Sequence, residues 1–224
     1  MSLAWGATVS GRVALEDSRE PEVRKKKDYS GVAVWLEKSG GAAPAPSPVT
    51  VRMLQKKKTF TPHVLAIPVG STVEFPNLDP IFHNAFSNFA GQPFDVGLYA
   101  PGRTEKVRFR REGVVRVFCN IHPTMSAVIL VVSSPWVAVS GRDGAFSIDG
   151  VPEGDYRLRV FHERATPQTL DQVERRISVN SGVQDLGVLA ISESGYIQTP
   201  HKNKYGKEYP AVIEDRPLYT GKRP

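Results

Sequence analysis

Short segments of β-type sequence recur along the whole chain, and they restrict its fold more than any other feature. They are rich in Val and Ile or alternate apolar with polar residues, and turn-forming residues separate them. With 19 glycines and 18 prolines in 224 residues, the composition disfavours a bundle of long helices. We therefore predict an all-β protein, with a charged loop at 16–28 and a helical turn at 169–174. Strands are expected at 9–13, 32–36, 50–54, 63–69, 72–75, 114–118, 127–132, 137–139, 146–148, 156–161, 176–179 and 186–191.

The net charge of +6 raises the question of a nucleic-acid partner. The basic residues lie in short separate runs, such as 24–27 and 56–58, and no motif of aromatic and basic residues for stacking bases accompanies them. We expect solvated loops that steer an acidic partner, and no nucleic-acid partner. No apolar run approaches the roughly 20 residues that cross a bilayer, so no integral membrane segment is expected.

The segment 118–125 reads FCNIHPTM and combines three types of metal donor between two predicted strands. It places Cys119, His122 and Met125 in the spacing C-x2-H-x2-M. Thiolate, imidazole and thioether donors favour copper, whereas the lack of carboxylates in the loop disfavours Ca²⁺ and Mg²⁺. The loop therefore predicts one type 1 copper site, with Met125 as the weak axial ligand.

A type 1 site needs a second imidazole, because so short a loop cannot surround a metal ion. His83 follows the predicted strand 72–75, and we expect it to be the missing ligand. The next residue, Asn84, carries an amide that can hold this loop to the Cys119 loop by a hydrogen bond, without touching the metal.

Three further histidines lie outside this set of ligands. His63 has no asparagine after it, and we interpret it as structural, with an extra ligand as the alternative. His162 and His201 are expected to be ordinary residues, although two such histidines can also hold an adventitious ion.

The region 50–132 resembles the cupredoxin family, and its ligand loop is most similar to that of the amicyanins. That family also has a short C-x2-H-P-x-M loop and a His-Asn pair upstream. The segment 60–79, FTPHVLAIPVGSTVEFPNLD, follows the family's order of Pro, apolar strand, Gly, apolar strand and Asn. The segment 86–106, FSNFAGQPFDVGLYAPGRTEK, departs from amicyanin and leaves the partner surface open. The resemblance implies a Greek-key β-sandwich that holds copper.

The two flanks resemble halves of one carboxypeptidase-regulatory-like, or transthyretin-like, β-sandwich. The motif is D-G-x-F at 143–146, followed by V-P-x-G-x-Y-x-L at 151–158. Neither flank has enough strands to bury a core by itself, so we expect the cupredoxin to be inserted in, or joined to, this second sandwich. The expected parts are a discontinuous sandwich at 1–47 and 134–192, a cupredoxin domain at 48–133 and an extended tail at 193–224.

The expected function is one-electron transfer between a donor and an acceptor redox protein. We do not expect an enzyme, because a Cys–His nucleophile needs a third group to orient the base and the loop contains no Asp or Glu. The edge of the His122 ring, exposed between Ile121 and Pro123, is the expected port for the electron. No signal peptide is visible, yet copper and a lone cysteine favour a periplasmic or other extracytoplasmic location.

Two alternatives stay open. The chain would be a copper carrier or resistance protein if the same ligands served no redox partner. It would be a carbohydrate-binding or protein-binding module if the transthyretin-like sandwich were the working part. Trp5, Trp35 and Trp136 fall in or beside predicted strands, so the sequence offers no exposed tryptophan cluster for sugars.

Overall fold

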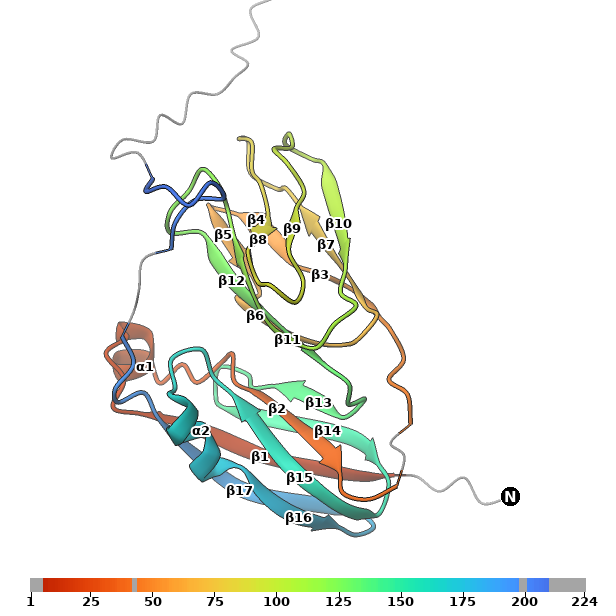
Figure 1. Cartoon of the computed structure of the whole chain (residues 1–224). Helices are drawn as coiled ribbons and strands as arrows, with labels where there is room; N and C mark the ends of the chain where they lie inside the picture. Colours follow the sequence, from red (N-terminus) through yellow and green to blue (C-terminus); the bar gives the residue numbers. More distant parts are fainter. Residues whose placement is uncertain (1–5, 42–43, 198–200, 210–224) are drawn as a thin grey trace, which may run out of the picture. The chain divides into compact units, whose positions relative to one another are not determined.

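The computed structural model describes residues 6–41, 44–197 and 201–209, and it divides the chain into two compact units (Figure 1). Unit 1 consists of Met1–Pro46 and Val132–Gln198, and unit 2 of Ser47–Val131 and Thr199–Pro224. The chain therefore passes between the units three times, and residues 199–224 of the expected tail belong to unit 2. The prediction of an all-β fold is confirmed. No helix in the described part of the chain is long and apolar enough to cross a membrane.

Unit 1 is a sandwich of two sheets, with the strand orders β14-β1-β17 and β13-β2-β15-β16 (Figure 1). β1 pairs antiparallel with β14 and parallel with β17. The N-terminal segment of unit 1 therefore pairs with strands that follow residue 132. Every second residue of β1 is buried, as expected for a strand with one face on a core. The strands are β1 (Ala7–Glu16), β2 (Ala33–Lys38), β13 (Val137–Val139), β14 (Ala145–Val151), β15 (Gly154–Phe161), β16 (Arg175–Val179) and β17 (Val183–Ser192).

Two short helices lie in the described part of unit 1. The prediction of a continuous loop at 16–28 is wrong, because α1 (Pro21–Lys26) forms inside it. This helix begins with proline, which suits a first helical position, and the buried side chain of Val23 anchors it to the core. The helix α2 (Pro167–Val173) includes most of the expected helical turn, and Thr166 caps it by accepting a hydrogen bond from a backbone N–H.

Unit 2 contains a second pair of sheets, with the strand orders β10-β7-β3 and β6-β12-β11-β8-β9, and the small hairpin β4-β5. β7 pairs parallel with β3 and antiparallel with β10, and β11 pairs antiparallel with β12 and β8. The strands are β3 (Thr50–Arg52), β4 (Leu54–Lys56), β5 (Thr59–Thr61), β6 (Val64–Pro68), β7 (Thr72–Pro76), β8 (Phe86–Ser87), β9 (Phe94–Asp95), β10 (Thr104–Arg108), β11 (Gly113–Phe118) and β12 (Ser126–Val132).

Side chains alternate between the core and the opposite face along β11 and β12, and this alternation extends to the residues just beyond the paired ends. Val115 and Val117 of β11 are fully buried, and Cys119 continues the same alternation just beyond the strand. Met125 lies two residues before the buried Ala127 of β12, so its side chain is on the same, inward face. Because successive side chains of a strand point to opposite faces, both sulfur-bearing residues face the interior.

Candidate metal centre

The loop with the C-x2-H-x2-M motif closes the hairpin of β11 and β12. The strands pair as far as Phe118 and Ser126, and the ladder continues where the N–H of Cys119 donates to the carbonyl of Met125 at 3.1 Å. Inside the loop, the N–H of Met125 donates to the carbonyl of His122, also at 3.1 Å. Backbone hydrogen bonds therefore fix all three donor residues of the loop relative to one another.

His83 reaches the same place from another part of unit 2. Its backbone forms an antiparallel bridge with Tyr99, with N–H to O distances of 3.2 and 2.9 Å. Its Nδ1 lies 3.9 Å from the Sγ of Cys119, and the Nδ1 of His122 lies 3.5 Å from the same sulfur. The donor atoms of these three residues all lie within 4.8 Å of one another. The structure thus brings His83 to the two donors of the loop, and Met125 is buried in the same core.

The spacing of these atoms would suit a metal ion held by the sulfur and the two nitrogens. Bonds of about 2.0 Å to nitrogen and about 2.3 Å to sulfur, about 120° apart, would hold the two atoms about 3.7 Å from each other. The observed distances of 3.5 and 3.9 Å lie on either side of this value. Two imidazoles and one thiolate are donors that suit copper, and all three side chains are at most 3% exposed. The site is therefore consistent with copper binding.

Asp79 orients His83, a contact that the sequence analysis missed. Its Oδ2 lies 2.8 Å from the Nε2 of His83, so a proton on Nε2 leaves the lone pair of Nδ1 facing Cys119. The backbone N–H groups of Lys57 and Lys58 donate to the two carboxylate oxygens at 2.6 and 2.8 Å. Burial favours a higher pKa for Asp79, but these N–H groups and His83 outweigh burial and lower it. The carboxylate is therefore available as an anionic acceptor.

Asn84 joins the loop that carries His83 to the loop that carries Cys119. Its Oδ1 accepts a hydrogen bond from the N–H of Asn120 at 3.2 Å. Its Nδ2 donates to Oδ1 of Asp95 at 2.7 Å and to the carbonyl of Gly97 at 3.0 Å. Since the side chain is fully buried, these bonds replace the water that its amide gives up.

The thiol of Cys119 is fully buried. Burial raises its pKa, and the backbone N–H groups of Ile121, Asn84 and His122 offset only part of that rise. A cation in the site would favour the thiolate, so metal binding is expected to release a proton.

His122 is more enclosed than the sequence analysis predicts. Its side chain is 3% exposed, so the prediction of a free ring edge is wrong. The rim around it consists of the partly buried Ile121 and the exposed Pro123 and Thr124. The ring is therefore buried, although two of its neighbours in the loop are exposed.

The structure keeps the other histidines away from the three donors. His63 is exposed, and its Nδ1 lies 3.0 Å from the carbonyl oxygen of Ser126. His162 belongs to unit 1, where its Nε2 lies 2.8 Å from Oε1 of Glu193. His201 belongs to unit 2 and stacks on Phe118, next to the ligand loop. The contact made by His201 is a second feature that the sequence analysis missed.

Comparison with known proteins gives matches only among solved structures. No protein-family model and no curated protein sequence matches the chain. Part of the chain is similar to cupredoxins. A purple cupredoxin from Nitrosopumilus maritimus is 26% identical over 37% of this chain and 99% of its own, with a TM-score of 0.34. A variant of amicyanin is 19% identical over 45% of this chain and 98% of its own, with a TM-score of 0.35.

A copper-containing nitrite reductase from Thermus scotoductus is also similar to the chain. It is 31% identical over 43% of this chain, with a TM-score of 0.35. The match spans 25% of the reductase, so most of that protein has no counterpart in the match.

Proposed function

We propose that the chain is a type 1 copper protein that transfers single electrons between redox partner proteins. One copper ion would be held by Nδ1 of His83, Sγ of Cys119 and Nδ1 of His122, with the thioether of Met125 as a weaker donor. The observation that supports this most strongly is the convergence of three buried donor atoms within 4.8 Å. Bound copper supplies the one-electron change between Cu(II) and Cu(I).

The surrounding residues hold the donors in a fixed arrangement. Asp79 accepts a hydrogen bond from the Nε2–H of His83 and thereby sets which nitrogen faces the site. Asn84 keeps the two ligand-bearing loops at a constant separation through Asn120. Burial of Cys119 excludes water from the sulfur. A site held in this way changes little between two oxidation states, which favours fast electron transfer.

The electron would pass through the ring of His122. The rim of Ile121, Pro123 and Thr124 adjoins this residue in the ligand loop, and two of these three residues are exposed. A redox partner would therefore dock on the rim, which places the imidazole between the partner and the sulfur of Cys119.

A thiol nucleophile is a weaker interpretation of the same residues. The third group that such a mechanism needs is present, because Asp79 hydrogen-bonds to His83. However, Cys119 is fully buried and its thiol has a raised pKa, whereas a nucleophilic cysteine requires an accessible thiolate. A substrate would have no path to the sulfur, so we propose an electron carrier rather than an enzyme.

The remaining parts of the proposal concern location and unit 1. We propose an extracytoplasmic location, because a buried lone cysteine that is occupied by copper is protected from oxidation there. We also propose that unit 1, which carries the D-G-x-F motif, is a transthyretin-like sandwich.

The proposal is tested by titrating the metal-free chain with Cu(II) and recording the visible spectrum. We expect one equivalent to produce an intense thiolate-to-copper band that a mild reductant bleaches reversibly. Cys119→Ala should abolish the band, and His83→Ala should abolish or greatly weaken it. His63→Ala is the matched control, because this histidine lies in the same unit but outside the donor group.

The outcomes also separate the alternative functions. A colourless complex, or copper binding that is indifferent to Cys119, would contradict the type 1 site. A coloured site with very slow electron self-exchange would favour a copper carrier. Glycan binding that persists in Cys119→Ala would direct attention to unit 1.

A further inference from the structure

We propose that residues 201–209, called the strap below, position the copper-ligand loop and control access to Cys119. This inference rests on the proposed copper site. It adds residues that lie far along the chain from the four proposed ligands and are separated from them by much of unit 1.

The strap makes two direct hydrogen bonds to the ligand loop, one to its backbone and one to a side chain. The phenol O–H of Tyr209 donates to the carbonyl oxygen of Cys119 at 2.7 Å. The backbone N–H of Lys204 donates to Oδ1 of Asn120 at 3.0 Å. Two consecutive residues of the loop are therefore held from outside, beginning with the residue that provides the thiol.

Aromatic packing adds a second contact between the strap and the loop. The ring of His201 stacks on Phe118, with centroids 4.1 Å apart and planes inclined by 23°. Tyr209 meets His201 edge to face, at a centroid distance of 5.2 Å. Phe118 points away from the core that Cys119 faces, so His201 covers the outer face of the strand end. The inner and outer sides of the ligand loop are both packed.

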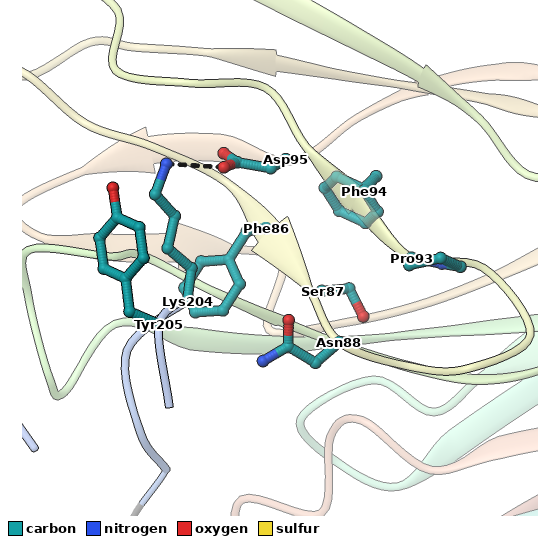
Figure 2. Close-up of a pocket in the computed structure, with 8 residues that line it drawn as sticks. All are labelled: Phe86, Ser87, Asn88, Pro93, Phe94, Asp95, Lys204 and Tyr205. Carbon is teal, nitrogen blue, oxygen red and sulfur yellow. Dashed lines mark hydrogen bonds and ion pairs between the residues drawn. The ribbon is translucent and has the colours of Figure 1, made fainter. Parts of the chain in front are cut away.

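Polar contacts close a ring between the strap and both ligand-bearing loops. The Nζ of Lys204 lies 2.7 Å from Oδ2 of Asp95 (Figure 2), and Oδ1 of Asp95 accepts a hydrogen bond from Asn84. Asn84 in turn binds the N–H of Asn120, whose side chain binds the N–H of Lys204. The same lysine and Tyr205 line a pocket of about 390 Å³ next to Phe86, a neighbour of Phe118 in the sheet (Figure 2).

These contacts assign a positioning role to Tyr209 and Lys204. The tip of a hairpin loop is the part of a sheet that opens first, because few backbone hydrogen bonds hold it. In this loop the strap adds bonds from outside at Cys119 and Asn120. Opening of the loop, which exposes the thiol and releases the metal, then requires the strap contacts to break as well.

The test uses the full chain without copper and measures the reaction of its thiol with 5,5′-dithiobis(2-nitrobenzoate). The thiolate attacks the disulfide and releases one coloured thionitrobenzoate. Since Cys119 is the only cysteine, the signal reports on this site alone. Tyr209→Phe keeps the ring but loses the hydrogen bond, and we expect the reaction to be about fivefold faster, as loss of about 1 kcal/mol implies. Lys204→Met should also accelerate it.

The matched control is Tyr205→Phe, which removes a hydroxyl from a strap residue that is 70% exposed and keeps the ring that faces Nζ of Lys204. It should react like the wild type. In the loaded protein, Tyr209→Phe should lose copper to a chelator faster than Tyr205→Phe and shift the thiolate-to-copper band. Equal rates in Tyr209→Phe, Lys204→Met, the control and the wild type would overturn the proposal.

Further measurements keep a folding defect apart from the proposed effect. Reaction through local opening is insensitive to low urea, whereas reaction through global unfolding accelerates steeply with urea. If a variant does not fold, amide hydrogen exchange in the wild type tests the proposal instead. The strap and the ligand loop should open together, so the amides of Lys204 and Asn120 should exchange at similar rates, and clearly different rates would contradict the proposal. The thiol assay needs no copper. A strap effect without a copper band would refute only the proposed function, and a band without a strap effect would refute only the strap.

Discussion

Glu193 provides a quantitative test of how unit 1 is stabilised. This carboxylate is 7% exposed and accepts hydrogen bonds from Ser18 at 2.6 Å, from Nε2 of His162 at 2.8 Å and from Arg164 at 3.0 Å. Burial favours a higher pKa for Glu193, but these three partners outweigh it and lower the pKa from 4.5 to about 2. The charged form is therefore favoured in the folded state.

The size and sign of the effect follow from this shift. A carboxyl with a lowered pKa stabilises the fold fully above pH 4.5, and the stabilisation disappears as the pH falls toward 2. A difference of about 2.5 pKa units corresponds to about 3 kcal/mol at pH 7, of which about 2 kcal/mol is lost by pH 3. Glu193→Gln should therefore cost about 3 kcal/mol at pH 7 but only about 1 kcal/mol at pH 3.

Tryptophan fluorescence allows this measurement in the intact chain. All three tryptophans, Trp5, Trp35 and Trp136, belong to unit 1, so urea unfolding followed by their emission reports on that unit. The wild type and Glu193→Gln are compared at pH 7, 5 and 3. If the cost of the substitution were the same at all three values, Glu193 would titrate normally in the folded protein, and the reasoning from its hydrogen bonds would fail.

Three further substitutions test other contacts. Asn84→Ala should destabilise unit 2 by about 2 kcal/mol because it leaves buried partners unsatisfied, and the midpoint of thiol exposure in urea measures this. Gly144→Ala should destabilise unit 1 by roughly 2–4 kcal/mol, because φ of Gly144 is +80° and an added Cβ would collide with the carbonyl oxygen of Val13. Gly141→Ala is the control, because a Cβ there would make only ordinary van der Waals contacts, and it should leave the urea midpoint of tryptophan fluorescence nearly unchanged. Asp79→Asn removes a negative charge beside the proposed site and should favour Cu(I) by about 1–3 kcal/mol, seen as a higher reduction potential in a redox titration; an unchanged or lower potential would contradict this.

The strand pattern and the spacing of the ligand loop could be predicted because both depend on neighbouring residues. The alternation at 156–161 corresponds to β15, and C-x2-H-x2-M brings Cys119 and His122 together within one hairpin. α1 was missed because a six-residue helix with one buried side chain is too short to show a helical period.

The supporting contacts of the site could not be predicted in the same way. Asp79 and His83 stand four residues apart in a loop, where no regular period indicates which carboxylate turns toward the imidazole. Tyr209 lies 90 positions from Cys119, and only the folded unit 2 brings the two together. The enclosure of His122 is likewise a property of the folded loop rather than of its composition.

The discontinuity of unit 1 sets an order in which the parts of the chain can be completed. β1 cannot pair with β17 until residues 183–192 exist, whereas the strands in the described part of unit 2 all lie between residues 50 and 132. As the chain emerges from its N-terminus, the donors from His83 to Met125 are therefore all present before the strap is made. At about 5–20 residues per second, the roughly 80 residues between 131 and 209 take about 4–16 s to synthesise. During this interval the ligand loop exists without the outer contacts that the strap provides.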